Sequence, residues 1–489
     1  MSGLLGLLGF LGQAIAGPVD IYGFGAQSIG RGQGGIAIAD DSTTVFRNPA
    51  LLQDLKMAEA VLGFGVYRSS FSLVPPLYWD TNQDGLIDDQ DDPLRVQPDA
   101  SNADALTLSI GRNVGKRFGL AFNGFVPTGS LLRFRTIEPA MPNWVMYGNR
   151  SQRYEFALGF GARVWRGLSL GAATEIVARA RYRVSADIYA GANASQEGAE
   201  ETSDLIDEVV IDVHDMTLDL VPSFVPIVGL YADAGEWVPS LEGLTAGLVY
   251  RWPSGLPIEV DLDIQINGAL TGLADFEPML LTLALPAQLQ IFDHYVPGRL
   301  SWGLAYGYRD MGRVYMDVHH TQWSAMRLNV AKLTAAEINS ELLQIGADSV
   351  VDGNAYEVEF SDTTSLHMGA EGFLPAIQVK GPAKELDIVV RGGFGYIPSP
   401  LVSQGESSIF LDADRVLFAG GLGFTHQDPL NLVPGPVSWD VFFTLHTLAS
   451  GELKPVDAGP ERPGSPVNGQ AVPIGGNLWS TGAQWSVEF

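Results

Sequence analysis

The feature that most constrains the fold is an alternation of side-chain character, which is the two-residue period of a β-strand. The clearest case is the C-terminal segment "LWSTGAQWSVEF". One face of this segment carries Trp479, Thr481, Ala483, Trp485, Val487 and Phe489. The segment "YEFALGFGARVW" at 154–165 alternates in the same way. A soluble sandwich of two sheets also alternates, so the pattern alone leaves the fold class open.

The connections between these segments alternate in length. Short connections occur at 115–117, 166–167 and 297–298. Long polar connections occupy 74–104, 128–150, 191–208, 321–353, 399–412 and 450–477. Tight turns at one end and long loops at the other are typical of outer-membrane barrels. The sequence therefore predicts an all-β fold, a transmembrane antiparallel β-barrel of about 14 strands. A soluble multi-strand protein is the alternative.

The expected strands follow from the same alternation. They lie near 57–73, 105–113, 117–127, 151–165, 167–190, 209–234, 243–268, 277–295, 299–320, 354–374, 383–398, 413–426, 435–449 and 478–489. Because no water reaches the hydrocarbon core, every backbone N–H and C=O must be paired within the protein, and a spanning sheet can have no edge. We therefore expect the sheet to close. An even strand number places the start of the first strand and the end of the last strand on the periplasmic side.

The N-terminal segment "MSGLLGLLGFLGQAIA" is interpreted as a signal peptide, residues 1–16. Its apolar core runs from Leu4 to Leu11, and Ala14 and Ala16 form a small-x-small cleavage site. The run is shorter than the about 20 apolar residues that a transmembrane helix needs. A buried N-terminal helix is the alternative.

Composition argues against several classes of function. The formal net charge of −27 disfavours nucleic acid as a partner, because nucleic-acid binding requires basic patches. The chain has no cysteine, which excludes disulfides and cysteine nucleophiles. His319 and His320 are adjacent and point to opposite faces of a strand, so a metal site there is not expected. No nucleophile motif stands out, and we do not expect an enzyme.

The segment "GAQSIGRGQGGIAIADDSTTVFRNPALL" carries a family resemblance. It is similar to the N-terminal hatch of the FadL/TodX-type outer-membrane transporters of hydrophobic compounds. That hatch has a Gly-Arg-Gly-like turn, an Ala-Asp-Asp step and an Asn-Pro-Ala, in this order. The matching residues are Gly30, Arg31, Gly32, Asp40, Asp41, Asn48, Pro49 and Ala50.

Further pieces resemble later strands of the family in the same order. "FGLAFNGFVPTG" is similar to the third strand and "VARARYR" to the fifth. "LTLALPAQLQIFDHYVPGRLSWGLAYGY" resembles the eighth and ninth strands. "VVRGGFGYIPSP" and "DADRVLFAGGLGF" resemble the eleventh and twelfth. These pieces span nearly the whole mature chain.

The resemblance implies a fourteen-stranded barrel at 57–489, with residues 17–56 folded inside as a plug. The residue types agree with short capped helices in the plug. Asp40, Asp41 and Ser42 are good N-caps, and Pro49 suits a first helical turn. An ordinary soluble loop is the alternative for this segment.

The segment "FVPTGS" at 125–130 ends the third expected strand. Proline donates no hydrogen bond to a sheet and is confined to edges, strand ends or bulges. In the family, a kink in the third strand opens the wall sideways, so that ligand leaves into the membrane. The resemblance therefore implies a lateral opening beside Phe125, Pro127 and Gly129. A simple strand end is the alternative.

Several arginines are candidates for binding a ligand carboxylate. Arg179 and Arg181 share one strand face with Arg183, and a lipid-facing arginine at midplane would cost about 2–4 kcal/mol, so we expect this face in the lumen. By resemblance, Arg179 and Arg181 match positions at which the family carries basic residues, and Arg391 and Arg415 match family positions too. Pairing with Glu175, Asp187 or acids of the plug is the alternative. Arg31 and Arg47 are expected to tether the plug to barrel acids.

The loop at 74–104 contains "DTNQDGLIDDQD", which fits a calcium-binding loop closely. The expected ligands are Asp80, Asn82, Asp84, the carbonyl of Leu86, Asp88 and Asp91, which replaces the usual glutamate. An acidic loop without metal is the alternative. In another long loop, "TAAEINSELLQIG" at 334–346 is expected to form a helix, begun by a capping box of Thr334 and Glu337. This helix would collect substrate or pack on the barrel rim.

These expectations converge on an outer-membrane channel of a Gram-negative cell. By resemblance it takes up hydrophobic compounds, long-chain fatty acids or aromatic hydrocarbons, by passive diffusion with plug rearrangement and lateral release. No cofactor is required apart from a possible Ca²⁺ in the outer loop, and a monomer in contact with outer-membrane lipids is expected. The alternative is a sealed barrel whose loops serve adhesion or scaffolding. An outer-membrane lipase is disfavoured.

Overall fold

The structure is a computed structural model of the whole chain. It describes residues 18–78, 93–94, 102–115, 117–129, 142–144, 146–147, 154–193, 206–271, 279–308, 311–326, 332–336, 358–378, 385–404, 410–428, 433–453 and 471–489. Within these ranges, no helix is both long and apolar enough to cross a membrane.

Fourteen antiparallel strands form a closed ring. In ring order they are β1 (Glu59–Phe71), β4 (Ala103–Val114), β5 (Phe118–Pro127), β6 (Glu155–Trp165), β7 (Leu168–Asn193), β8 (Ile206–Asp233), β9 (Leu244–Arg251), β12 (Gly298–Tyr308), β13 (Gly312–Gln322), β16 (Thr363–Gln378), β17 (Glu385–Ile397), β19 (Arg415–Gln427), β20 (Pro436–Leu453) and β21 (Val472–Glu488). The ring closes where β1 pairs with β21, from Glu59 opposite Glu488 to Phe71 opposite Gly476. The predicted fold class is confirmed.

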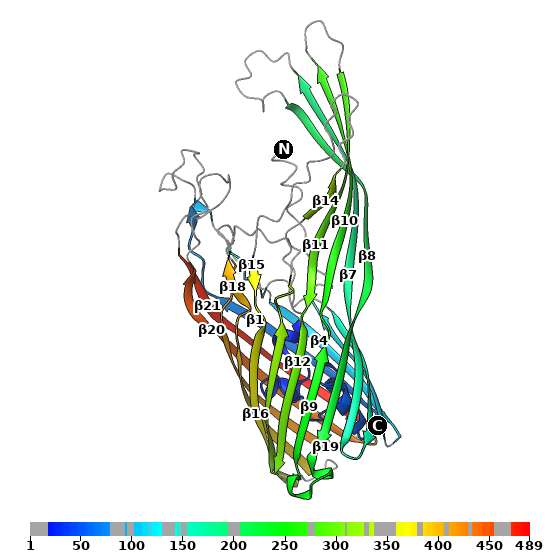
Figure 1. Cartoon of the computed structure of the whole chain (residues 1–489), viewed down its shortest axis with the longest axis vertical. Coiled ribbons are helices and arrows are strands. Elements are labelled where there is room, and N and C mark those ends of the chain that lie inside the picture. Colours follow the sequence, from blue (N-terminus) through cyan, green and yellow to red (C-terminus); the bar gives the residue numbers. More distant parts are fainter. Residues whose placement is uncertain are drawn as a thin grey trace.

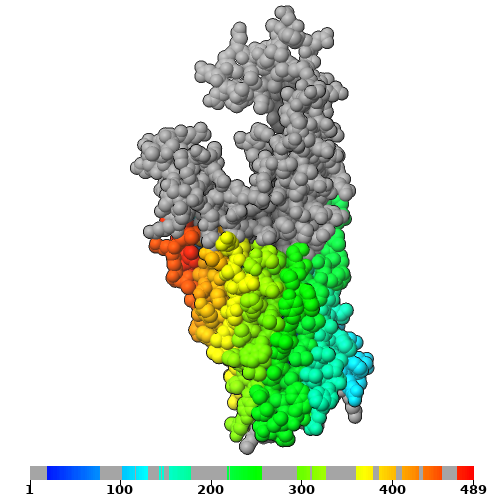
Figure 2. Space-filling view, in the orientation of Figure 1, coloured from blue at the N-terminus to red at the C-terminus, as the bar shows by residue number. Residues whose placement is uncertain are grey.

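The wall alternates as the sequence predicts. On β5, Phe118, Leu120 and Phe122 are exposed on the outside, whereas Ala121 and Asn123 are buried toward the interior. The colours in Figure 2 pass in sequence order around the visible wall, because each ring strand lies beside its neighbours in the chain. An outward apolar surface of this kind suits contact with lipid.

One strand boundary was wrong. The connection at 297–298, predicted to be a tight turn, joins β11 (Met279–Val296) directly to β12. The turn lies instead between β12 and β13, so the run 299–320 is two strands. The segment that resembles the eighth and ninth strands therefore contains β12, the eighth strand of the ring, and most of β11, which continues β12 beyond the rim. Pro297 donates no ladder hydrogen bond, and the chain changes partners there without reversing direction.

Five strands build a sheet beyond the rim of the ring (Figure 1). The pair β9 and β12 continues upward as the hairpin of β10 (Ser254–Thr271) and β11. β10 then pairs in parallel with the far part of β7, whose other edge holds β8. A short strand, β14 (Lys332–Ala336), adds to β11.

The expected helix at 334–346 is wrong at its beginning. Residues 334–336 belong to β14, where a free strand edge of β11 offers backbone partners that outweigh the capping box. The rest of that segment lies outside the described residues. Two small sheets complete the outer end: β2 (Leu77–Tyr78) with β3 (Pro93–Leu94), and β15 (Val358–Phe360) with β18 (Leu401–Gln404).

Residues 18–56 lie inside the ring (Figure 1). They form α2 (Pro18–Tyr22), α3 (Ala26–Gly30) and the 3-10 helices η1 (Ser42–Phe46) and η2 (Pro49–Asp54). The α3 helix packs against β19 and β20, while η2 packs against β6 and β7. Two further 3-10 helices, η5 (Ala234–Glu236) and η6 (Pro239–Leu241), form the turn between β8 and β9.

Local sequence explains how this inner segment folds without a core of its own. Asp41 accepts a hydrogen bond from Thr43 N at the start of η1, and Asn48 accepts one from Ala50 N at the start of η2. Pro49 occupies the first turn of η2, as expected. Glycines of the wall let η2 approach closely, since a Cβ on Gly119 would overlap the carbonyl oxygen of Leu52.

Candidate functional site

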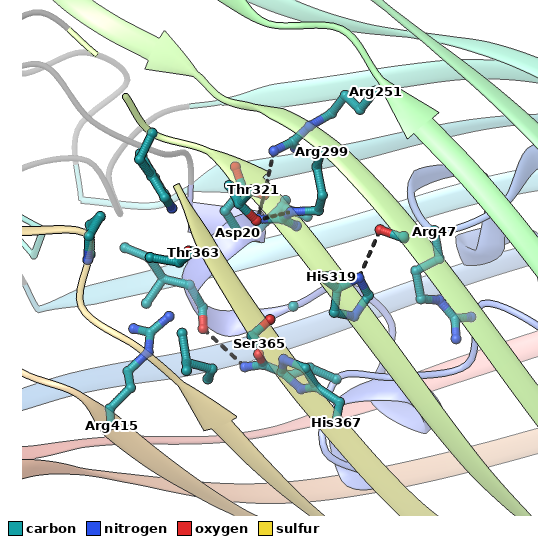
Figure 3. Close-up of a pocket in the computed structure, with 18 of the residues that line it drawn as sticks. Asp20, Arg47, Arg251, Arg299, His319, Thr321, Thr363, Ser365, His367 and Arg415 are labelled. Atoms are coloured by element: carbon teal, nitrogen blue, oxygen red, sulfur yellow. Dashed lines mark hydrogen bonds and ion pairs between the residues drawn. The ribbon is translucent and has the colours of Figure 1, made fainter. Parts of the chain in front are cut away.

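A cavity of about 140 Å³ lies between the inner segment and the wall (Figure 3). The head of the inner segment, around α2, forms one side of it. Strands β12, β13 and β16 form the facing side, and residues near the start of β19 complete it. The cavity therefore lies where a ligand entering from the loop end would meet the inner segment.

The wall side of this cavity is polar. It carries Ser301, His319, Thr321, Thr363, Ser365 and His367. Ser301 is the register partner of His319, and the two side chains are hydrogen-bonded at 2.8 Å. His367 donates from Nδ1 to the carbonyl of Gly32, also at 2.8 Å, because a carbonyl oxygen can only accept. The two imidazole rings meet edge to face with centroids 5.1 Å apart.

The side formed by the inner segment is mainly apolar. Val19, Ile21 and Phe24 of the head and Phe46 of η1 line the cavity there. Behind them, Tyr22 contacts Tyr67 of β1 with ring centroids 4.5 Å apart, and Tyr67 contacts Phe125 of β5 at 6.0 Å. The cavity is thus amphipathic, and an aromatic chain links its apolar side to β5.

The α2 helix is fixed to the wall by one acid. Asp20 is paired with Arg251 of β9 and with Arg299 of β12, each at 2.8 Å (Figure 3). Glu175 of β7 approaches Arg251 at 3.4 Å. Burial alone would raise the pKa of Asp20, but the two guanidinium groups outweigh it and lower the pKa below its usual value.

A second ion network holds the middle of the inner segment. Arg31 pairs with Asp40 at 2.5 Å and with Glu371 of β16 at 3.0 Å. Arg47 also reaches Asp40, at 2.7 Å. Burial opposes the ionised form of Asp40, yet Arg31 and Arg47 lower its pKa far below the usual range. Burial likewise opposes the charge on Arg31, but Asp40 and Glu371 raise its pKa above its ordinary value. A dense network of this kind keeps buried charges paired.

Hydrogen bonds fix the remaining inner residues that the sequence singled out. Gln484 of β21 donates to Asp41 at 2.6 Å and accepts from Ala26 N at 2.8 Å. Asn48 donates to the carbonyls of Ile36 and Leu230. Gly30 lies against Gly421 of β19, where a Cβ would be 3.1 Å from its Cα, and Gly32 has a φ of +92° against the backbone of β17. The sequence motifs therefore mark the contacts that seat this segment in the ring.

The arginines expected at the site have different surroundings. Arg31 does pair with a barrel acid, whereas Arg47 pairs within the inner segment. Arg391 is buried and paired with Glu371 at 3.3 Å and with Asp440 at 2.5 Å. Arg415 lines the cavity and lies over the ring of Tyr147 at 5.6 Å. Its Nε has no hydrogen-bond partner among the described residues. Of the four candidates, Arg415 is thus placed to meet a ligand, while Arg391 serves the ion network.

Arg179 and Arg181 lie in the far part of β7, away from the cavity. Arg181 is opposite Asp219 of β8 and Glu259 of β10, and Arg179 is opposite Val221. The side chains of Arg179 and Arg181 lie outside those that the structure describes. A role of either residue in ligand binding stays a prediction.

The pairing of β5 with its two neighbours shows where the expected lateral opening would begin. β5 pairs with β6 from Phe118 to Phe125, and Phe125 faces Glu155. Val126 and Pro127 pair only with β4 among the described strands. Phe125 is fully buried against Tyr67, and a Cβ on Gly129 would meet nothing within 4 Å. The ladder between β5 and β6 therefore ends beside the aromatic chain, and an opening at this point stays a prediction.

The calcium motif cannot be placed, because Asp80, Asn82, Asp84, Leu86, Asp88 and Asp91 lie outside the described residues. No group of three or more metal-binding side chains occurs in the part of the chain that the structure describes. A second, larger cavity of about 1030 Å³ opens at the end of the ring where β1 begins and β21 ends. Asp40 and Arg313 line it, so the ion network separates the two cavities.

Sequence reasoning missed much of the cavity. His319, His367, Asp20, Arg251 and Arg299 were not predicted at a site, although strand alternation alone assigns His319 and His320 to opposite faces. The two side chains do face opposite ways, as expected. His319 lines the cavity, whereas His320 is exposed and hydrogen-bonded to Thr364. The misplaced turn at 297–298 hid the pairing of β12 with β13, which brings Ser301 and His319 together. No local signal marks Asp20 as the partner of two distant arginines.

A closed ring of fourteen strands with an N-terminal segment in its lumen defines a plugged β-barrel of the outer membrane. No family model matches the chain. A structure of a Pseudomonas aeruginosa FadL homologue aligns with 98% of this chain and 100% of that chain, with a TM-score of 0.50 and 13% identity. The chain therefore has the FadL-type fold that the resemblance implied, and a closed barrel with an apolar outer surface is the architecture of an outer-membrane protein.

Two further proteins are similar to this chain. "Alkane uptake protein A" of Marinobacter nauticus is 23% identical over 306 residues, which are 61% of this chain. The match covers 57% of that relative's own length. The Pseudomonas putida toluene transporter TodX is 12% identical, with 96% of this chain and 99% of that chain covered and a TM-score of 0.49.

Proposed function

We propose that this protein is an outer-membrane channel that takes up hydrophobic compounds, fatty acids or hydrocarbons, by passive diffusion. The observation that carries the proposal is the amphipathic cavity against α2, inside a ring whose lumen holds residues 18–56. The alkane uptake protein supports the same ligand chemistry. In this proposal a ligand enters from the loop end, binds in the cavity and leaves after the inner segment moves. No energy source, cofactor or catalytic step is required.

The size of the cavity limits what fits before any rearrangement. An apolar cavity of about 150 Å³ can hold one benzene molecule, and the cavity here measures about 140 Å³. A single aromatic ring or a few methylene groups can therefore enter the closed state. A longer chain needs α2 to move, because α2 forms the apolar side.

Arg415 is the proposed partner of an acidic head group. A guanidinium group presents several donors to a carboxylate, and Nε of Arg415 has no other acceptor among the described residues. The Ser and Thr hydroxyls on β12, β13 and β16 give further hydrogen bonds to a polar head. Arg179 and Arg181 lie on the far part of β7. In this proposal they would bind the ligand before it reaches the cavity.

The path of release is proposed to run sideways. Tyr22 of α2 covers Tyr67, which contacts Phe125 at the point where the β5–β6 ladder ends. If α2 moves, the apolar side of the cavity joins this point. Ligand would then pass beside Phe125, Pro127 and Gly129 into the membrane. The ion network around Asp40 can stay intact during this movement, because it involves residues after Gly30.

Uptake measurements in cells test the proposal. Cells carrying the full chain, a chain lacking residues 17–50, or an empty vector receive radiolabelled oleate or toluene. We expect the full chain to take up at least one of them faster than the empty vector. The deleted chain should also admit small hydrophilic solutes, because its lumen is no longer filled. Equal uptake by the full chain and the empty vector would exclude transport and favour a sealed barrel for adhesion or scaffolding.

We also propose that the motif at 80–91 binds Ca²⁺ and stiffens the outer loop. Its oxygen-rich side chains at alternate positions support this assignment. Calorimetric titration of Ca²⁺ into the purified protein should give binding heat that Asp84→Ala abolishes. Asp99→Ala in the same loop is the matched control and should leave the heat unchanged. Equal heats for the full chain and Asp84→Ala would contradict the proposal.

A further inference from the structure

Two buried polar atoms at one end of the cavity have no hydrogen-bond partner among the described residues. They are Nε of Arg415, at the start of β19, and Oδ1 of Asp412, which precedes that strand. Each residue is only 8% exposed, and both line the cavity. A buried polar atom without a partner is costly, and native structures leave few of them. A free donor and a free acceptor in one cavity therefore indicate a ligand that pairs with both.

The neighbours of Asp412 hold its carboxylate in one orientation. Oδ2 accepts a hydrogen bond from the hydroxyl of Ser399 at 2.5 Å. That hydroxyl itself accepts from Leu401 N at 3.2 Å, so its proton is directed to Asp412. The residue before it, Leu411, donates its backbone N–H to the carbonyl of Asn143 at 2.7 Å. Oδ1 is therefore the carboxylate oxygen that stays available to a ligand.

Arg415 is fixed by packing. Its guanidinium carbon lies over the ring of Tyr147, at a cation–π distance. Its register partners, Ile397 of β17 and Leu448 of β20, are both apolar. Figure 3 shows Arg415 well apart from Asp20 and the two arginines that pair with it. Because a guanidinium N–H can only donate, Nε is a fixed donor at this end of the cavity.

The free donor and the free acceptor lie close together without bonding to each other. Neither Nε of Arg415 nor Oδ1 of Asp412 has a partner, so the two atoms are not paired. Both side chains nevertheless lie close enough to interact with the hydroxyl of Tyr147. One hydroxyl group of the protein thus already stands near both residues. A second hydroxyl, carried by a ligand, can bridge the two atoms that remain.

A hydroxyl group matches this pair better than other head groups do. It accepts from Nε of Arg415 with a lone pair and donates its proton to Oδ1 of Asp412. An aldehyde or ketone satisfies the donor alone, and a hydrocarbon satisfies neither atom. A carboxylate satisfies Arg415 but meets a like charge on Asp412, whose pKa of about 6 leaves it ionised at pH 7.5.

Apolar side chains beside the pair suit the body of such a ligand. Ala413 lies between the two residues in the chain, and Pro398 follows the register partner of Arg415. Both line the cavity, as does Met146. Val19 and Ile21 of the inner segment line it as well. With a volume of about 140 Å³, the closed cavity takes a single ring.

We propose that the cavity binds neutral hydrophobic compounds that carry a hydroxyl group, such as phenols and alcohols, through Arg415 and Asp412. This inference rests on the proposed function and narrows the substrate class of the same channel. The hydroxyl accepts from Nε and donates to Oδ1, while the ring or chain lies against the inner segment. An acid is the weaker ligand at neutral pH and binds better once Asp412 is protonated.

Calorimetric titration tests this preference by comparing phenol with toluene, which are single rings of similar size that differ in one substituent. The full chain is embedded in lipid nanodiscs at pH 7.5, and empty nanodiscs give the blank for partition into lipid. We expect phenol to bind at least about 10-fold more tightly than toluene, because hydrogen bonds to charged groups are among the stronger ones. Benzoate should bind more weakly than phenol.

Two variants remove the partners one at a time. Asp412→Ala removes the acceptor, and it should lower the affinity for phenol about 10-fold and raise that for benzoate. Arg415→Met removes the donor and should lower the affinities for phenol and benzoate together. Asp387→Ala, at an exposed position of β17 outside the cavity, is the matched control and should leave both affinities unchanged. Heat-dependent gel mobility shows which variants are folded, so either one can carry the test.

Several results would overturn the inference. Equal or weaker binding of phenol than of toluene to the full chain would mean that water serves the two free atoms. A phenol preference that a folded variant retains would place the hydroxyl elsewhere in the cavity. Uptake of oleate and toluene by cells is measured in parallel. Failure of both uptakes would contradict the proposed function, whereas the calorimetric preference does not depend on transport.

Discussion

Asp40 is the residue on which the seating of the inner segment depends most. It is buried and accepts from both Arg31 and Arg47, so its removal leaves two buried guanidinium groups with fewer counter-charges. Breaking a buried pair in this way costs about 3–5 kcal/mol. We expect Asp40→Asn to lower the free energy of unfolding by this amount, measured by urea titration of the refolded barrel. Glu236→Gln, in the exposed pair with Arg166, should change it by about 1 kcal/mol or less.

The same carboxylate makes the seated segment sensitive to acid. Its pKa is lower in the folded protein than in the unfolded chain, so its contribution to stability is complete above about pH 4. The contribution is lost as pH falls through the lowered pKa. Asp40→Asn should therefore flatten the acid limb of a stability–pH curve. An unchanged acid limb would show that other carboxylates control it.

Asp412 should make acid binding at Arg415 depend on pH near 6. Burial raises the pKa of Asp412 to about 6, against the lowering effects of a hydrogen bond from Ser399 and of Arg415. Below that pH Asp412 is neutral and the positive charge of Arg415 is less compensated. Dodecyl sulfonate, which stays ionised, should therefore bind more tightly at pH 5 than at pH 7.5, by calorimetry in nanodiscs. Asp412→Asn should remove this difference, and a difference that persists would exclude Asp412 as its cause.

At the scale of elements, α2 is the part of the inner segment that the proposed uptake requires to move. It forms the apolar side of the cavity and covers Tyr67. Tying α2 to β1 in a Tyr22→Cys/Tyr67→Cys variant with a reducible thiol cross-linker should therefore reduce uptake to the level of the empty vector. Reduction of the linker should restore it. The pair Trp439→Cys/Trp485→Cys, which links the neighbouring wall strands β20 and β21 on the outer surface, should transport before and after cross-linking. Unchanged uptake with α2 tied would contradict its movement.

The elements show which features sequence can reveal and which it cannot. Strand alternation and capping residues are local, so the ring strands and the caps Asp41 and Asn48 were predictable. The reversal between β12 and β13 was missed because Pro297-Gly298 is a stronger turn signal than the residues after Tyr308. The cavity was largely missed because it joins α2 to strands about 230 and more residues away, as in the pair of Asp20 with Arg251. No local pattern encodes that contact.

At the scale of the whole molecule, the ring and the hairpin of β10 and β11 beyond its rim are separable. The ring does not use β10 or β11, and Arg251 of β9 is the direct register partner of Arg299 of β12. A two-residue Asn-Gly turn is the length that joins directly paired residues of this kind. The hairpin between them is thus an addition to the barrel, placed where β9 and β12 leave the rim.

Replacing residues 252–298 with Asn-Gly should leave a folded fourteen-stranded barrel. We expect the shortened protein to migrate differently on gels with and without heating, as a closed barrel does, and to take up dissolved toluene. Truncation before Val472 is the control, since it removes the partner that closes β1 and should abolish the heat-dependent mobility. If the shortened protein fails to fold, the hairpin of β10 and β11 supports the barrel and is not an addition to it.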